Sequence, residues 1–263
     1  MNAKLIFLKL GGSLITDKAR AEIALPDLIF TLLSDLKQFL LENPDQRVLL
    51  GHGSGSFGHH AAAKYHTRDG VSNPEEWHGF AEVWHSARKL NQIVLDTGRQ
   101  AGLDLIAFPP SASILLDNKK LKSWNLEPLK MALQADLIPL IYGDVVFDKK
   151  LGGTILSTEE LFAHLAKELK PARILLAGKE VAVFADFPQN QKPIQRIDKD
   201  AKLEATLQTS ENQDVTGGMR AKVEEMQALC RAIPGTQIEI FHAEAKNDLH
   251  NALIGRHAGT IIS

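Results

Sequence analysis

A stretch rich in glycine and serine, HGSGSFGHH at residues 52–60, has the composition of an anion-binding turn. It follows an apolar run at 47–50 that predicts a short buried strand, and it precedes alanines that suit a helix. A strand, a glycine-rich turn and a helix start together present backbone N–H groups to an anion. Glycine permits close approach, and His59 could add a donor. A solvated loop is the alternative, and the glycine pattern alone does not decide.

Further glycine turns lie next to predicted strands: Gly11-Gly12, Gly143-Asp144 and Gly217-Gly218. Lys9 and Lys18 flank the first of them, and Lys222 follows the last. Because the C-terminal ends of parallel strands meet at one edge of a sheet, we expect these turns to gather there. Lysine charges and oriented N–H groups are what phosphoryl transfer requires. No G-x-x-x-x-G-K-[S/T] sequence occurs, which excludes the P-loop class of phosphotransferases.

Each candidate side chain also has a purely structural interpretation. Lys9 could be a strand-end lysine that reaches solvent, and Lys18 could be an ordinary loop lysine. His59 could cap a helix, whereas its neighbour His60 is expected to be solvated. Asp144 could be a turn residue or could orient a lysine. The aromatic residues of the segment 74–100 favour a core position over a ligand wall; they are Trp77, Phe80 and Trp84.

The elements that must position these residues follow from apolar periodicity. It predicts strands at 4–10, 47–50, 103–108, 137–142, 145–147, 174–177, 181–184, 237–242 and 261–262. It predicts helices from Pro26 onward and at 74–100, 128–134, 157–169, 217–229 and 248–253. Residues 109–111 and 148–153 are expected to be turns, and 199–213 is the least organised stretch. This alternation predicts an α/β protein with a mostly parallel sheet, divided near Pro171 into two lobes.

Composition narrows the classes of function. The chain has 263 residues, 44% of them hydrophobic, with a net charge of −2, so no broad basic surface favours nucleic acid. Cys230 is the single cysteine, which excludes a disulfide framework and a cysteine zinc site within the chain. No apolar run reaches membrane-spanning length, and the N-terminus leads into a strand rather than a signal peptide. We therefore expect a cytoplasmic protein, and the histidine spacing predicts no metal site.

The segment KLGGSLITDK at residues 9–18 resembles the opening of the amino acid kinase superfamily. Together with residues 52–59, GDVV at 143–146 and DVTGGM at 214–219, it resembles isopentenyl phosphate kinase more narrowly. The resemblance implies an open αβα sandwich with a phosphate-acceptor lobe at 1–170 and an ATP-binding lobe at 171–263. It also implies transfer of a phosphoryl group from ATP to isopentenyl phosphate, Mg²⁺ carried by the nucleotide, and a homodimer.

The resemblance also implies a role for each matching residue. The residues that would hold ATP are Lys9, Leu10, Gly11, Gly12, Ser13, Gly55, Gly218 and Lys222. Those that would contact the acceptor are Ser54, His59 and Gly143, with His59 binding its phosphate. Lys18 would steady the transferring phosphoryl group, so that Lys9, Lys18 and His59 form the catalytic set.

One segment departs from the family, and two rival functions stay open. Where the family has an aspartate-bearing segment after a strand, residues 177–184 read AGKEVAVF, which puts nucleotide contacts near Lys179 in question. A kinase of another phosphate or phosphonate, like the fosfomycin kinases, is the first rival, and a non-catalytic nucleotide sensor is the second. An isoprenoid tail needs an apolar slot beside the acceptor phosphate, and Val83 and Trp84 are our candidates for its wall.

Overall fold

The structure is a computed structural model that describes residues 4–17, 19–186, 189–202, 216–257 and 259–263. Its main sheet has eight strands in the order β12-β14-β13-β9-β1-β2-β6-β3. Neighbouring strands are parallel except for β13 and β14, which run antiparallel. The predicted α/β class with a mostly parallel sheet is confirmed.

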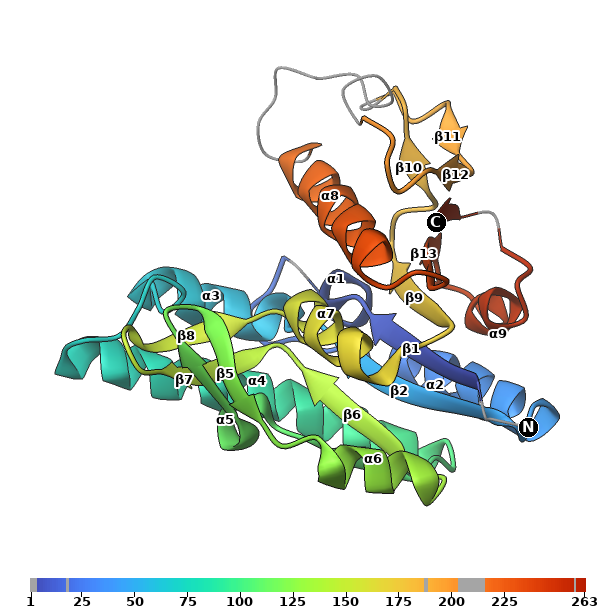
Figure 1. Ribbon diagram of the computed structural model, residues 1–263. Helices are drawn as coiled ribbons and strands as arrows, with labels where there is room; N and C mark the ends of the chain where they lie inside the picture. The colour runs from blue at the N-terminus through green and yellow to red at the C-terminus, as the bar shows by residue number, and fades with distance from the viewer. Residues whose placement is uncertain (1–3, 18, 187–188, 203–215, 258) are drawn as a thin grey trace.

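The central strand is β1 (Lys4–Leu10), which pairs with β2 (Gln46–His52) on one side and with β9 (Arg173–Gly178) on the other (Figure 1). The remaining strands of the sheet are β3 (Leu105–Ala107), β6 (Ile138–Tyr142), β12 (Arg196–Ile197), β13 (Gln237–His242) and β14 (Thr260–Ile262). Both halves of the chain therefore share one continuous sheet, and the division at 1–170 and 171–263 stays a prediction.

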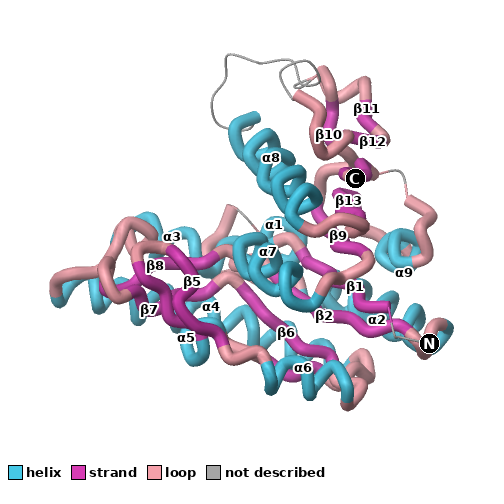
Figure 2. Tube along the Cα trace, in the orientation of Figure 1, coloured by secondary structure: helices cyan, strands magenta, loops and turns pink. Residues whose placement is uncertain are grey.

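Helices flank the strands on both faces of this sheet (Figure 2). One face packs on α2 (Pro26–Glu42), α4 (Pro74–Gln100) and α9 (Asp248–Leu253). The other packs on α6 (Glu127–Gln134), α7 (Thr158–Leu169) and α8 (Thr216–Ala232). Because side chains alternate along a strand, Leu8 and Leu10 belong to the first core and Phe7 to the second. The same alternation places Lys9 on the face of α7 and α8.

A second sheet, in the order β5-β4-β7-β8, was mostly missed by the sequence analysis. Its strands are β4 (Ile114–Asp117), β5 (Lys120–Trp124), β7 (Asp144–Asp148) and β8 (Gly152–Leu156). Only β7 was predicted. The sequence of β5, KLKSW, is largely exposed and has no apolar run that would indicate a strand. The buried Asp148 carboxylate accepts backbone N–H bonds from Asn118, Lys119, Lys150 and Leu151, so one side chain orders both hairpin turns.

Other boundaries need correction. The strand expected at 103–108 is only β3, and that at 181–184 is only β10 (Val183–Phe184), which pairs with β11 (Pro193–Ile194) in a small separate sheet. The turn at 109–111 contains a short helix, α5 (Pro110–Ser113). Phe80 is core as expected, but Trp77 and Trp84 are exposed. Most of 199–213 lies outside the described residues.

Candidate active site

A cavity of about 580 Å³ lies where β1, β2 and β6 end. Three of the predicted glycine turns contribute to its wall, together with the first turn of α7 and one residue of α8. The residues singled out from the sequence that line it are Lys9, Gly11, Gly12, Ser13, Ser54, Gly55, Gly143, Asp144 and Lys222. The structure thus brings together residues that are far apart in the chain, at the edge of the sheet where we expected them.

Two of the glycine turns pack backbone against backbone. A Cβ atom added to Gly12 would lie 2.3 Å from the Gly55 nitrogen, and one added to Gly53 would lie 2.8 Å from the Gly12 nitrogen. Gly55 also has a φ of +51°, which side chains disfavour. Thr16 Oγ1 donates to the Gly12 carbonyl (2.7 Å) and accepts from Ser56 N–H (3.0 Å). These contacts hold the starts of α1 (Gly12–Ile15) and α3 (Gly55–Tyr65) together at the cavity.

Lys9 is 7% exposed and forms an ion pair with Glu159, in the first turn of α7. Burial lowers the pKa of Lys9, and the Glu159 carboxylate opposes that effect. Burial alone would raise the pKa of Glu159, but Lys9 and, more weakly, Lys222 hold it below its ordinary value. Glu159 is therefore an ionised carboxylate with a lysine from β1 and a lysine from α8 nearby.

Glu159 was not among the predicted site residues, because it lies within a helix-capping motif. Ser157 Oγ accepts from Glu160 N–H (3.1 Å), and Glu160 Oε2 accepts from Ser157 N–H (2.7 Å), so the two residues form a capping box at the start of α7. That motif needs only the second of the two glutamates. Glu159 has no part in the capping box, and this spare carboxylate was the feature of the sequence that could have indicated a functional residue.

Asp144 is 1% exposed and lines the cavity. Its oxygens accept from Ser111 N–H (3.2 Å) and Val145 N–H (2.9 Å), which favours the turn interpretation over the orientation of a lysine. Burial raises the pKa of Asp144 to about 6.

His52, at the end of β2, forms a buried support beneath the glycine turn. Its Nδ1 lies 3.1 Å from the Gly53 carbonyl and must carry the proton there, so Nε2 accepts from the Asn91 amide (3.2 Å). The ring stacks on Tyr142, and Thr158 Oγ1 donates to the His52 carbonyl (2.6 Å). Burial lowers the pKa of His52 to about 4, so the ring is neutral at physiological pH.

Part of the cavity wall is apolar. This part comes from α3, α4 and β8, through Ala62, Val83, Ala87, Ile155 and Leu156. Val83 therefore lies where an apolar tail was expected to bind. The prediction for Trp84 is wrong, because its side chain is 36% exposed and packs beneath the Arg88 guanidinium instead of lining the cavity.

A sequence model described as "Amino acid kinase family" matches residues 4–242. The chain belongs to the amino acid kinase family. It is 33% identical to isopentenyl phosphate kinase of Methanocaldococcus jannaschii, over 98% of both chains. It is 30% identical to isopentenyl phosphate kinase of Methanothermobacter thermautotrophicus, over 98% of this chain and 99% of that one. A crystal structure of an isopentenyl phosphate kinase superposes with a TM-score of 0.83 at 27% identity, covering 98% of this chain and 100% of the other.

The comparisons confirm the resemblance drawn from the motifs and identify the chain as a phosphotransferase of this family. As a kinase, it uses ATP. Among the described residues, none of the helices combines the length and the hydrophobicity that a membrane span requires.

The individual roles of several site residues stay predictions. Lys18 lies outside the described residues, and His59 lies in α3 with its side chain outside them. Gly218 lies in the first turn of α8. Leu10 is fully buried in the core, and its carbonyl accepts from Gly53 N–H (3.0 Å), so its part in the site is to anchor the glycine turn.

Proposed function

We propose that this kinase transfers the γ-phosphoryl group of ATP to isopentenyl phosphate and forms isopentenyl diphosphate. The observation that carries the proposal is the two-sided cavity, in which glycine turns and lysines adjoin an apolar slot. An acceptor with one phosphate and a hydrocarbon tail fits such a site. A polar acceptor would need further hydrogen-bond donors where Val83, Ala87 and Ile155 line the wall. The names of the similar kinases agree with this substrate.

The charges of the site suit direct transfer between two anions. An oxygen of the acceptor phosphate would attack the γ-phosphorus, and the bond from that phosphorus to the bridging oxygen of ADP would break. A phosphate monoester loses its second proton near pH 6, so the acceptor needs no general base at neutral pH. Lys9 and Lys222 would neutralise charge on the nucleotide, while Glu159 keeps the two ammonium groups from repelling each other.

The proposed division of labour follows the two halves of the chain. Residues 1–170 would bind the acceptor through Ser54, His59 and Gly143, and residues 171–263 would bind ATP together with the first glycine turn. Mg²⁺ carried by the nucleotide would supply further neutralisation of phosphate charge. Lys179 lies where the family has its aspartate. The Lys179 Nζ atom is 3.8 Å from Glu244 Oε1, and the Lys179 carbonyl is 2.8 Å from His242 Nδ1. We expect weaker contacts to the nucleoside there.

The decisive experiment offers γ-labelled ATP and isopentenyl phosphate to the purified kinase. Labelled isopentenyl diphosphate is the expected product. Transfer to a phosphonate such as fosfomycin without transfer to isopentenyl phosphate would favour the first rival. ATP binding without transfer to either would favour a sensor.

Variants of the glycine turn test the acceptor site. His59→Ala should raise KM for isopentenyl phosphate and leave KM for ATP nearly unchanged, since a charge-assisted bond to the acceptor phosphate is lost. His60→Ala is the matched control and should change neither. A cytoplasmic location and a homodimer are also proposed, and sedimentation would test the second.

A further inference from the structure

Arg68 lines the cavity, on the turn between α3 and α4. Its backbone is held in place: Thr154 Oγ1 of β8 donates to the Arg68 carbonyl (2.9 Å), and Asp69 N–H donates to the His66 carbonyl (2.9 Å). Its side chain is 59% exposed and contacts Glu160 Oε1 through Nη2 at 3.2 Å. The base of this side chain is therefore fixed, while its charged end has one exposed ionic contact.

The contact with Glu160 is easily exchanged. An exposed ion pair with a single contact contributes little to stability. Glu160 does not depend on Arg68 for its position, because its other oxygen accepts from Ser157 N–H (2.7 Å) in the capping box. A guanidinium group has five N–H donors in one plane, more than this contact uses.

Carboxyl groups of α7 and α8 interact electrostatically with the Arg68 guanidinium. Glu225 of α8 is half-buried, and burial, followed by the neighbouring Glu159 and Glu160, raises its pKa. Lys9 and Arg68 act in the opposite direction on that carboxyl. Arg68 thus lines the cavity and interacts with carboxyl groups on both α7 and α8.

We propose that Arg68 binds the phosphate of the acceptor, exchanging its contact with Glu160 for two phosphate oxygens. The planar guanidinium suits bidentate recognition of a phosphate, and Arg68 is the only arginine among the described residues that line the cavity. Its backbone is joined to β8, the strand that contributes Ile155 and Leu156 to the apolar wall of the cavity. The identity of the acceptor as isopentenyl phosphate rests on the proposed function.

Two charge-removing variants distinguish phosphate binding by Arg68 from an ion pair that only holds the loop in place. Arg68→Gln should raise KM for isopentenyl phosphate ~10- to 100-fold and change KM for ATP less than about threefold. Glu160→Gln keeps a residue that completes a capping box but removes the competing charge. It should leave KM for the acceptor unchanged or lower it ~2- to 5-fold. If the ion pair only pinned the loop, both variants would shift this KM in the same direction, and that result would overturn the proposal.

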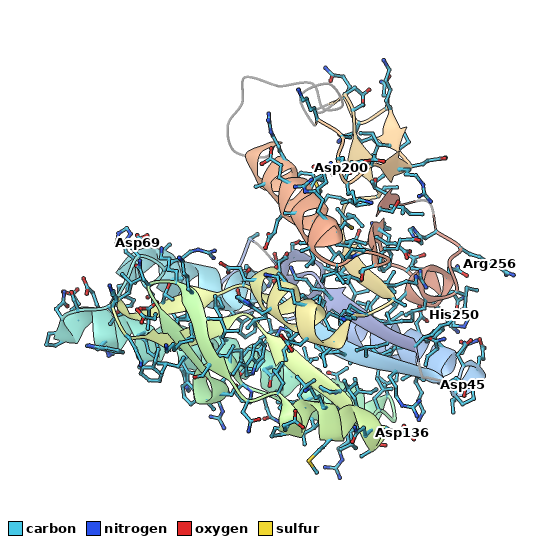
Figure 3. All side chains as sticks on the ribbon, in the orientation of Figure 1. Asp45, Asp69, Asp136, Asp200, His250 and Arg256 are labelled. Atoms are coloured by element: carbon cyan, nitrogen blue, oxygen red, sulfur yellow. The ribbon has the colours of Figure 1, made fainter. Side chains whose placement is uncertain are left out.

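Conservative and distant variants complete the set. Arg68→Lys keeps the charge without the planar fork, so its KM for the acceptor should fall between those of the wild type and Arg68→Gln. Arg47→Gln is the control, because Arg47 forms an ion pair with Asp136 at the opposite edge of the sheet. Figure 3 labels Asp136 at the lower right and Asp69, the neighbour of Arg68, at the left. Arg47→Gln should leave both KM values unchanged.

Failure of this inference and failure of the proposed function have different signatures. Wild-type turnover of isopentenyl phosphate with an unchanged KM in Arg68→Gln would overturn the role of Arg68 and leave the function standing. If the wild type does not turn over isopentenyl phosphate, calorimetric titration with inorganic phosphate decides. Weaker phosphate binding by Arg68→Gln than by the wild type would support an anion-binding Arg68, and equal Kd values would overturn it.

Discussion

Two buried ion pairs lie on opposite faces of the eight-stranded sheet, and their surroundings differ. Lys9 and Glu159 meet beside the cavity, at the C-terminal end of β1. The second pair joins Arg173, the first residue of β9, to Glu239 of β13, which is 1% exposed.

The second pair is saturated by the protein itself. Arg173 donates to both oxygens of Glu239 (2.6 and 2.8 Å) and to the carbonyls of Ala252 and Leu253. His257 Nδ1 accepts from Gly259 N–H, so Nε2 carries the proton and donates to Glu239 (2.6 Å). Burial alone would raise the pKa of Glu239, but the bonds from His257 and Arg173 hold it below its ordinary value.

The Lys9 pair, in contrast, opens on a cavity. An ammonium group has three donors, more than the single carboxylate oxygen of its partner uses. The comparison teaches that burial of a charge does not by itself indicate function. A saturated pair can only stabilise the fold, whereas a pair beside a cavity keeps donors for a ligand.

The largest expected effect is a loss of protein stability when the Arg173–Glu239 pair is broken. Glu239→Ala leaves the Arg173 guanidinium without its carboxylate and should lower the free energy of unfolding by about 3–5 kcal/mol, measured in urea. KM values should not change at temperatures where the variant is folded. Glu127→Ala, which removes an exposed partner of Lys130, is the control and should have little effect on stability. A loss below about 1 kcal/mol for Glu239→Ala would contradict the comparison.

The open pair should behave in the opposite way when both members are replaced. Lys9→Met combined with Glu159→Met removes both buried charges of the pair together, so the free energy of unfolding should stay within about 1 kcal/mol of the wild type or rise. The same double variant should lose ~10²- to 10³-fold in kcat, because a preorganised charge at the nucleotide is gone. Urea unfolding and steady-state kinetics measure the two effects. A kcat within tenfold of the wild type would remove Lys9 from the mechanism.

His52 shows whether a buried group beside the cavity is structural when the protein itself supplies all its hydrogen-bond partners. It lies beside the cavity, yet both ring nitrogens have partners. Because burial lowers its folded-state pKa to about 4, its stabilising contribution is complete above its ordinary pKa and is lost as pH falls toward 4. The loss between pH 6.5 and 4 should amount to about 3 kcal/mol.

The measurement for His52 is the free energy of unfolding of the wild type minus that of His52→Gln, as a function of pH. This difference should decrease as pH falls, whereas KM values above pH 6 should keep the same pH dependence in both proteins. A difference that does not vary with pH would show that His52 is not a buried neutral ring.

The smallest expected effect concerns adjacent residues of α4. Val83→Ala enlarges the apolar wall and should improve the use of longer prenyl phosphates relative to isopentenyl phosphate, by ~5- to 10-fold in the ratio of kcat/KM values. Trp84→Ala, one position further along the helix, should leave this ratio unchanged because Trp84 does not line the cavity. A change of chain-length preference in Trp84→Ala alone would reverse our assignment of the two faces.

Local patterns in the sequence determined most of the helices, strands and turns of this protein. The alternation of strands and helices, the start of α2 at Pro26, the capping box at Ser157 and the glycine turns all depend on neighbours within a few residues. The gathering of three turns at one cavity followed from a general property of parallel sheets. Lys9 was identified for the same reason, since it ends the strand before the first turn.

Only the tertiary structure decided which side chains meet at the cavity and which strands pair. Glu159 becomes part of the site only because α7 packs on the face of β1 that carries Lys9, 150 positions away in the chain. Arg68 reaches the cavity because β8 holds its backbone, and the β4–β5 hairpin joins the second sheet only because β4 pairs with β7. Val83 and Trp84 differ by one step of about 100° around α4, and only the packed helix shows which of them faces the cavity. Each of these contacts joins segments distant in sequence, so no local periodicity encodes it.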